Sequence, residues 1–354
     1  MIATELAPAY RDSCGVTTAN RVAAADHCQV ATTEQSEVAA SEYLEVAGDA
    51  DDPAGTAQAE HWLDKDRIAC NMADVNKLAN MLRCCTMCPR RCRVNRKAGE
   101  TGYCGIGAEA KVASTGAHFG EESVLVGDGG SGAIFFAGCN LHCIYCQNYD
   151  ISQQAHGRDV SMEELADMML RLAADGVCNV NLVTPSHVAA RIAQALVIAR
   201  GRGLTLPIVY NTGGYDTVET LQTLEGLIDI YMPDMKYADG IVAADLSDAR
   251  DYPQVNQTAV REMHRQVGDL TIENGLATRG LMVRHLVLPN RLSQATAIID
   301  FLADNISAHT ALNVMGQYRP CYQAVRCPAI MRRPHSEEIE EATAYATKKG
   351  LRLL

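Results

Sequence analysis

The sequence predicts an α/β fold in which a partial, open (β/α)6 barrel of the TIM type follows a small cysteine-rich module. Two observations support this prediction. From about residue 131, short apolar runs alternate with amphipathic segments, and eight of the fourteen cysteines fall between Cys84 and Cys146. Alternating strands and helices are typical of a parallel sheet covered by helices. Six such units are too few for a closed eight-stranded barrel, so we expect an open one.

The expected strands are short apolar runs that end at turn residues, and each is followed by a segment with the apolar spacing of a helix. The strand candidates are residues 132–138, 179–185, 206–213, 228–236, 280–289 and 311–318. The helix candidates are residues 162–176, 187–201, 216–224, 254–266, 293–305 and 336–350. Gly176 is expected to cap the first of these helices, because glycine readily adopts the left-handed conformation of a helix end.

Three regions are expected along the chain: an acidic, partly helical N-terminal segment (1–83), a Cys-rich metal-binding module (84–110) and a core domain (125–354). Residues 1–60 contain two Arg, no Lys and eleven acidic residues, so they contribute −9 of the formal net charge of −12. This acidity argues against a nucleic-acid partner. The sequence shows no apolar stretch of about eighteen residues and no signal-peptide pattern, so we expect a cytoplasmic protein without a membrane span.

The segment GCNLHCIYCQN (138–148) contains the main chemical motif. It places Cys139, Cys143 and Cys146 with the spacing C-x3-C-x2-C directly after the first strand. Without a secretory signal, clustered cysteines are typical of metal ligands. Three thiolates on a cubane of four irons leave one iron open, as a site that binds a cofactor or substrate requires. A zinc site completed by His142, or a set of buried thiols, is the alternative.

A second group of cysteines precedes the barrel. Cys85, Cys88, Cys92 and Cys104 have the spacing C-x2-C-x3-C-x11-C. This glycine-rich segment has little apolar content, so a metal is expected to hold it together. Four thiolates suit either zinc or an auxiliary iron–sulfur cluster, and the spacing does not decide between them. The basic stretch within it (90–97) belongs to this module, or it is a solvated loop.

Several stretches resemble a known family. The C-x3-C-x2-C spacing with Tyr145 before the last cysteine resembles the signature of the radical SAM superfamily. CTMCPRRCRVNRKAGETGYCG, NLVTPSH, VYNTGGYD, IYMPDMKY, VRHLVLP and MGQYRP resemble a subgroup related to pyruvate formate-lyase activating enzymes. The resemblance covers the chain from about residue 85 to its end. It implies a barrel of the radical SAM type and a [4Fe–4S] cluster that cleaves S-adenosylmethionine (SAM) to a 5′-deoxyadenosyl radical.

The resemblance also implies a SAM pocket along the carboxyl ends of the strands. The activating enzymes have Gly-Gly-Glu-Pro after the second strand, where this chain has Thr-Pro-Ser-His. Hydroxyl groups, a carboxylate, an ammonium and a guanidinium at this edge suit the ribose hydroxyls and carboxylate of SAM. The expected cofactor-binding residues are Tyr145, Thr184, Ser186, Asn211, Asp234, Lys236 and Arg284. The alternative is that Asp234 and Lys236 form a solvated loop pair and that Arg284 braces the sheet.

The implied reaction is hydrogen abstraction, with a glycine of a partner glycyl-radical enzyme as the target. A low-potential electron donor such as flavodoxin or ferredoxin is the expected second partner, and no catalytic side chain is assigned. A small molecule or a peptide is the alternative substrate, because one fold serves many functions. The alternative outside the enzyme class is an iron–sulfur protein for electron transfer or scaffolding.

Overall fold

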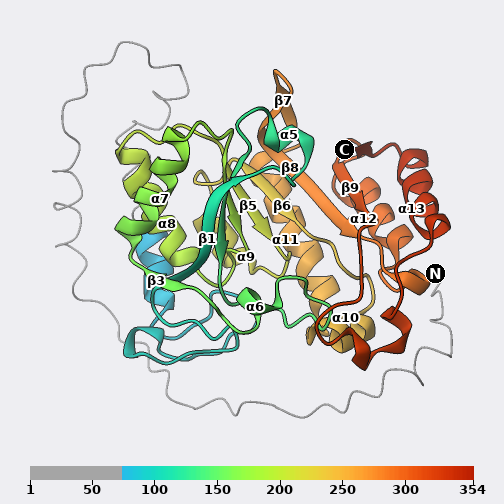
Figure 1. The fold of residues 1–354 in the computed structure, drawn as a ribbon, viewed down its shortest axis with the longest axis horizontal. Helices are drawn as coiled ribbons and strands as arrows, with labels where there is room; N and C mark the ends of the chain where they lie inside the picture. Colours follow the sequence, from blue (N-terminus) through green and yellow to red (C-terminus); the bar gives the residue numbers. More distant parts are fainter. Residues whose placement is uncertain (1–73) are drawn as a thin grey trace.

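The computed structural model describes residues 74–354 (Figure 1). Most of the predicted N-terminal segment, residues 1–73, therefore lies outside the described residues, and its described end is helical at residues 74–81. Within the described part of the chain, no helix is both long and apolar enough to cross a membrane.

A single sheet organises the described residues. Its strand order is β10-β9-β8-β6-β5-β4-β2-β1-β3, and β7 pairs only with β8. Every neighbouring pair from β2 to β10 is parallel. These strands are β2 (Ser131–Phe136), β4 (Val180–Val183), β5 (Ile208–Thr212), β6 (Ile230–Pro233), β8 (Leu276–Leu286), β9 (Ala311–Met315) and β10 (Arg352–Leu353). The strand order ends at β10 on one side and at β3 on the other, so the sheet does not close on itself. The predicted open α/β barrel is therefore confirmed.

Four strands were not predicted. β1 (Ala110–His118) pairs antiparallel with β2, β3 (Arg158–Val160) pairs with β1, β7 (Thr271–Glu273) forms a hairpin with β8, and β10 pairs parallel with β9 after the last helix. The last five residues of β1 are exposed, so the strand lacks the continuous apolar run of a strand buried on both faces. β1 connects the cysteine-rich module to the sheet, and the domain boundaries at residues 84, 110 and 125 stay predictions.

The helices cover the sheet where the periodicity predicts them. These are α7 (Met162–Ala174), α8 (Ala189–Gly201), α9 (Val218–Thr223), α11 (Tyr252–Val267), α12 (Ala295–Asn305) and α13 (Ser336–Lys348). α7 begins at a capping box between Ser161 and Glu164, and Gly176 beyond its end has φ 83°. The short elements α5 (Ser123–Val126), α6 (Tyr149–Ser152), α10 (Gly240–Ser247) and the 3-10 turns Arg96–Ala98, Pro289–Arg291, Ala324–Arg326 and Pro328–Ile330 were not predicted.

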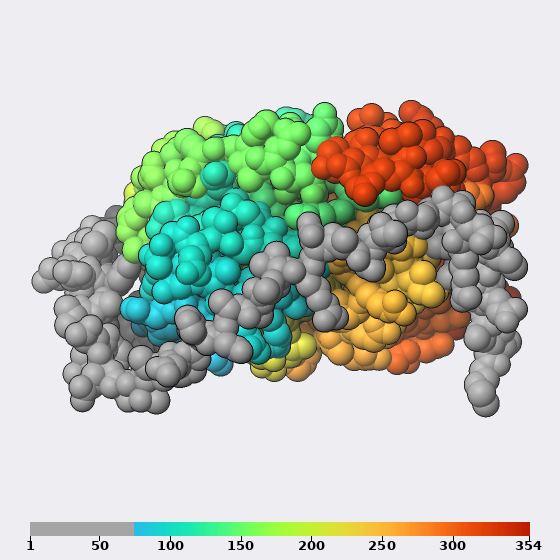
Figure 2. Space-filling model, turned by 90° about the horizontal axis from the view of Figure 1, so that it is seen from below, coloured from blue at the N-terminus to red at the C-terminus, as the bar shows by residue number. Residues whose placement is uncertain are grey.

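The carboxyl ends of the parallel strands meet at one edge of the sheet, at the bottom of Figure 1. α6 follows β2 at this edge, and α10 follows β6. Figure 2 views the molecule from this side, where the blue to cyan surface marks the described chain from residue 74 through the cysteine-rich module to β1. All five residues of β5 are buried, as expected of a parallel strand covered on both faces. Polar side chains needed for chemistry therefore collect in the loops at this edge.

Candidate active site

The cysteine loop, residues 139–146, connects β2 to the turn before α6. Each of its thiols has a polar neighbour. The Leu141 amide donates to Cys139 Sγ at 3.3 Å, the Ser247 hydroxyl donates to Cys143 Sγ at 3.0 Å, and Cys146 Sγ lies 3.1 Å from Ser152 Oγ. Burial, followed by the charges of Cys143 and Cys146, raises the pKa of Cys139 to about 12. The three sulfurs are therefore close enough to influence one another electrostatically.

The donor set of this loop fits an iron–sulfur cluster. Buried thiolates that repel one another need a cationic partner, and backbone and hydroxyl donors to sulfur are typical of cluster sites. Within residues 74–354, no three His, Cys, Asp or Glu side chains converge as ligands of a single metal ion. A cubane does not require such convergence, because each thiolate binds a different iron. His142 stacks on Tyr103 at a centroid distance of 4.0 Å, so the geometry gives no support for zinc completed by His142.

The predicted charged residues lie together in one hydrogen-bonded group. Asp234 Oδ2 accepts from Lys236 Nζ at 2.6 Å, and Asp234 Oδ1 accepts from Arg284 Nε at 3.0 Å. Arg284 Nη2 also donates to Asn211 Oδ1 at 2.7 Å, and Arg284 Nη1 lies 3.6 Å from Glu121. The exposed fractions of the Lys236 and Asp234 side chains are only 15% and 14%. The pair that the alternative places on a solvated loop is thus mostly buried.

Lys236 connects this charged group to the cysteine loop. Burial raises the pKa of Cys143, and the Lys236 ammonium opposes that rise. Burial alone would also raise the pKa of Asp234, but the charges of Lys236 and Arg284 outweigh it and lower this pKa. Asp234 in turn holds the pKa of Lys236 above its ordinary value against the effect of burial. At neutral pH, the edge therefore presents both charge signs beside the thiols.

Thr184 and Ser186 reach the same edge through different contacts. The Thr184 amide donates to the Asn211 carbonyl at 2.9 Å, and its φ of 62° is a rare conformation for a β-branched residue. Such strain is found preferentially at functional sites. The Ser186 hydroxyl instead pairs with Thr212 Oγ1 at 2.9 Å, and Thr212 also donates to the buried Asp216 at 2.6 Å. The roles of Thr184 and Ser186 in cofactor binding stay predictions.

Tyr145 lies inside an aromatic group that packs on the cysteine loop. Its hydroxyl is hydrogen-bonded to the Tyr237 hydroxyl, and Tyr237 bonds to Ser247 Oγ at 2.7 Å. The ring meets Tyr318 edge-on at 5.6 Å. Tyr145 is therefore connected through the Tyr237 hydroxyl to Ser247, which donates to Cys143 Sγ. Contact of Tyr145 with an adenine stays a prediction.

Two residues of α11 that the sequence analysis missed hold the turn after β6. Tyr252 donates its hydroxyl to the Asp234 carbonyl at 2.9 Å and accepts from the Lys236 amide at 3.1 Å. Asn256 Nδ2 donates to the same carbonyl at 2.9 Å. Their spacing of four residues places both on one face of the helix. The predicted helix (254–266) contained Asn256 but began two residues after Tyr252, so its boundary hid the four-residue spacing that was the available signal.

Two buried histidines fix the loops of the site. His187 Nε2 is 2.8 Å from the Ala137 carbonyl, just before the cysteine loop, and His285 Nδ1 is 2.7 Å from the Met235 carbonyl. In each ring the bonded nitrogen must therefore donate. The other ring nitrogen is buried and has no hydrogen-bond partner among the described residues. Burial lowers the pKa of each histidine from 6.5 to about 4, because protonation would bury an unpaired charge.

These histidines are expected to weaken the fold in acid. Their folded-state pKa is depressed, so their contribution is complete above pH 6.5 and is lost as the pH falls towards about 4. The loss is on the order of 3 kcal/mol for each ring. The double variant His187→Gln, His285→Asn keeps a donor near each bonded nitrogen and does not titrate. Denaturant unfolding at pH 7 and 5 should show a smaller pH dependence for the variant, and an equal dependence would contradict this account.

The predicted ligands of the second module also lie near one another. Burial raises the pKa of Cys88, and the charges of Cys104, Cys85 and Cys92 add to that rise. The Tyr103 amide donates to Cys92 Sγ at 3.3 Å. Within residues 74–354 these thiols do not converge on a single ion, and the choice between zinc and an iron–sulfur cluster stays open. A second metal stays a prediction.

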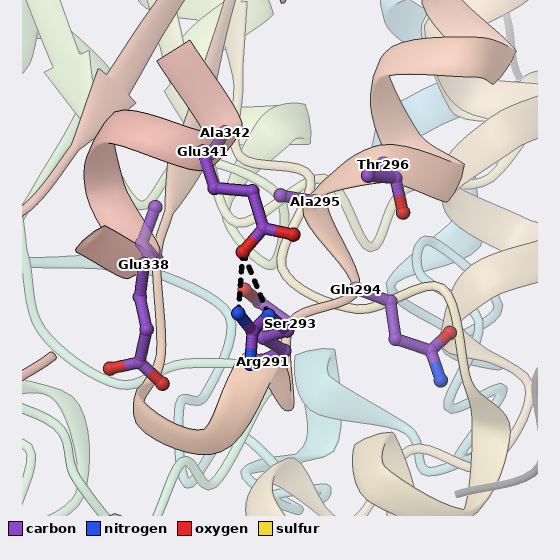
Figure 3. Close-up of a pocket in the computed structure, with 9 residues that line it drawn as sticks. Arg291, Ser293, Gln294, Ala295, Thr296, Glu338, Glu341 and Ala342 are labelled. Carbon is purple, nitrogen blue, oxygen red and sulfur yellow. Dashed lines mark hydrogen bonds and ion pairs between the residues drawn. The ribbon is translucent and has the colours of Figure 1, made fainter. Parts of the chain in front are cut away.

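A surface pocket lies just beyond the carboxyl end of β8, between the turn at Pro289–Arg291, the start of α12 and α13 (Figure 3). Arg291 and Glu341, which line it, form an ion pair at 2.7 Å with both side chains largely exposed. Such a pair contributes about 0–1 kcal/mol. None of the predicted site residues lines this pocket.

Comparison with known proteins gives related sequences and structures. A sequence profile described as the radical SAM superfamily matches residues 133–290. Uncharacterized protein MJ0674 of Methanocaldococcus jannaschii is 33% identical over 305 residues, which cover 82% of this chain and 83% of that protein. Uncharacterized protein MJ0808 of the same organism is 24% identical over 76% of this chain and 79% of that protein.

Among solved structures, Streptococcus suis SuiB bound to S-adenosylmethionine is similar over 61% of this chain and 47% of that chain, with 12% identity and a TM-score of 0.44. SuiB bound to the precursor peptide SuiA is similar over 61% of this chain and 46% of that chain, with 12% identity and a TM-score of 0.42. The match thus spans about half the length of these solved chains.

Proposed function

This chain belongs to the radical SAM superfamily, and we propose that it binds a [4Fe–4S] cluster through Cys139, Cys143 and Cys146 and binds SAM against the charged group at the same edge. The observation that supports this most directly is Lys236, which is bonded to Asp234 at 2.6 Å and acts electrostatically on Cys143. The cluster and the charged group are thereby parts of one site. When bound, the cluster would supply the electron that cleaves the sulfonium C–S bond of SAM, which gives methionine and a 5′-deoxyadenosyl radical.

The residues of the chain have separate tasks in this proposal. The three thiolates hold the cluster and leave one position open for the cofactor. Asp234, with its pKa lowered, stays ionised and fixes Lys236 and Arg284 by charge-assisted hydrogen bonds. The buried aromatic group around Tyr145 keeps water from one side of the cysteine loop, which limits loss of a reactive radical to solvent.

Cleavage of SAM tests the proposed function. Anaerobically reconstituted protein, reduced with dithionite, is expected to convert SAM into 5′-deoxyadenosine and methionine, which chromatography separates. The same protein without reductant is the control and should produce neither. A reduced cluster that leaves SAM intact would contradict the enzyme and favour a role in electron transfer or scaffolding.

For the substrate, we propose a glycine backbone of a partner glycyl-radical enzyme, with electrons from flavodoxin or ferredoxin. The support is the motif resemblance to the activating enzymes, above all Asp234 and Lys236 at the end of the fourth predicted strand. A small molecule or peptide substrate is the alternative. Incubation with a candidate glycyl-radical protein should generate a glycyl signal in electron paramagnetic resonance (EPR). Production of 5′-deoxyadenosine without that signal would favour the alternative.

The cysteine-rich module is proposed to hold a metal of its own. Cys88→Ala is expected to lower metal content and the free energy of unfolding while leaving the first cluster largely in place, because structural metals stabilise their segments locally. Metal analysis and EPR of the variant check this. Loss of all iron together with the first cluster would show that the two cysteine groups form one site.

A further inference from the structure

Arg90, which lies between two cysteines of the second module, spans two other segments of the site. Its Nε donates to the Asn140 carbonyl in the cysteine loop at 2.8 Å. Its two terminal nitrogens donate to the carbonyls of Asp248 at 2.5 Å and Ser247 at 3.4 Å, at the end of α10. The exposed fraction of the Arg90 side chain is 13%. One guanidinium therefore joins segments that are far apart in sequence.

Aromatic rings hold this guanidinium in place. Its central carbon lies 3.7 Å from the ring centroid of Tyr103 and 5.3 Å from that of Tyr215. Tyr103 stacks on His142 of the cysteine loop, and its hydroxyl donates to Asp248 Oδ2 at 2.9 Å. Arginine stacked on an aromatic face keeps all its donors available for carbonyls. The cysteine-rich module thus contacts the cysteine loop and α10 together.

The end of α10 transmits this contact to a cluster ligand. The Ser247 carbonyl accepts from Arg90, and the Ser247 hydroxyl donates to Cys143 Sγ at 3.0 Å. The Ile144 amide also donates to the Leu246 carbonyl at 2.9 Å. A Cβ on Gly138 would lie 2.6 Å from the Cys104 carbonyl, so the module also packs closely on the start of the loop. Arg90 and the Ile144–Leu246 hydrogen bond therefore hold the end of α10, and with it the Ser247 hydroxyl, against the cysteine loop.

We propose that Arg90 is a positioning residue that orients Ser247 towards Cys143 and thereby makes a cluster on the cysteine loop easier to reduce. An added electron increases the negative charge on the cluster, and a hydrogen bond to a ligand sulfur stabilises the reduced form. The positive charge of the guanidinium acts in the same direction. Removing Arg90 should therefore lower the reduction potential. This inference rests on the cluster of the proposed function, and it does not require SAM cleavage.

Redox titration of the reconstituted holoprotein, followed by EPR, tests the proposal. The relevant signal is the one that Cys143→Ala removes. Arg90→Ala is expected to lower the reduction equilibrium constant about tenfold, which is about 59 mV for a one-electron couple, with iron content unchanged. Arg90→Lys retains the charge but not the three-point contact, so it should show a smaller shift in the same direction. This variant therefore separates the effect of the positive charge from the effect of positioning Ser247.

Arg91→Ala is the matched control, because Arg91 forms an exposed ion pair with Glu219 at 3.2 Å and should leave the potential unchanged. If Arg90 acts through Ser247, the shift in Arg90→Ala, Ser247→Ala should be smaller than the sum of the two single shifts. An unchanged potential and EPR spectrum in Arg90→Ala would overturn the proposal, as would equal shifts in the Arg90 and Arg91 variants.

Should Arg90→Ala fail to fold, Arg90→Lys decides by the same criteria. A wild-type cluster that is reduced without cleaving SAM would contradict the proposed function and leave this comparison valid. Cleavage of SAM together with equal potentials in wild type and Arg90 variants would overturn the positioning role alone.

Discussion

Cys143→Ala is expected to abolish SAM cleavage and to remove about four irons per chain from the cysteine loop, since a cubane needs every protein thiolate of an already incomplete set. Cys143 is the most constrained of the three proposed ligands. Its sulfur accepts from Ser247, it is only 8% exposed, and Lys236 acts on its charge. Iron analysis, EPR of the reduced protein and chromatography of the SAM products measure the effect. Activity should fall below detection.

Cys178→Ala is the control for this substitution. Cys178 is a free cysteine whose thiol donates to the Val126 carbonyl at 3.2 Å, before the start of β4 and thus at the opposite edge of the sheet. This variant should retain its iron and its SAM cleavage. A Cys143→Ala protein that retained the full signal of a reducible cluster would show that the cysteine loop does not hold it.

The barrel was predictable because its central strands, such as β5 and β6, are buried on both faces. β5, with all five residues buried, begins with the apolar run Ile-Val-Tyr, and such runs between amphipathic helices indicate a parallel sheet. β1 was missed because half of it is exposed and it pairs antiparallel at the side of the barrel. α10 was missed because its eight residues are almost uniformly apolar or small and show no helical periodicity.

The polar residues at the carboxyl edge were predictable as a group. The carboxyl ends of parallel strands lie at a single edge of the sheet. Asn211, Asp234 and Arg284 therefore had to lie near one another once the strand order was known. Their pairing was not predictable, because the sequence gives no distances. The same holds for Tyr252 and Asn256, whose contacts with the Asp234 carbonyl depend on how α11 packs on β6.

The contacts of Arg90 show the limit of sequence reasoning most clearly. A basic stretch around a cysteine suggests a metal module or a solvated loop, and both descriptions fit the residue types. Arg90 and Arg91 are adjacent and chemically identical, yet one is buried among carbonyls and rings and the other forms an exposed pair with Glu219. Only the tertiary structure distinguishes them.

Asp234→Asn is expected to weaken SAM binding by roughly tenfold to hundredfold, the value of a charge-assisted hydrogen bond of about 1.5–3 kcal/mol. SAM has a cationic sulfonium and amine, a carboxylate and ribose hydroxyls, so its pocket requires both charge signs. Asp234 is the anion bonded to both Lys236 and Arg284. Without it, Lys236 loses its ion pair and Arg284 keeps only the more distant Glu121 as an acidic partner. Calorimetric titration of SAM into the reconstituted variant measures the change.

Asp229→Asn provides the matched control, because Asp229 forms a mostly buried pair with Arg200 at 2.9 Å just before β6, whereas Asp234 lies just after it. Breaking a buried pair costs about 3–5 kcal/mol of stability, so both variants should unfold more easily. Only Asp234→Asn should lose SAM affinity, because only its pair lies at the carboxyl edge. Equal affinities in the two variants, with iron content intact, would reduce Asp234 to a structural partner of Lys236 and Arg284 and place the SAM contact elsewhere on this edge.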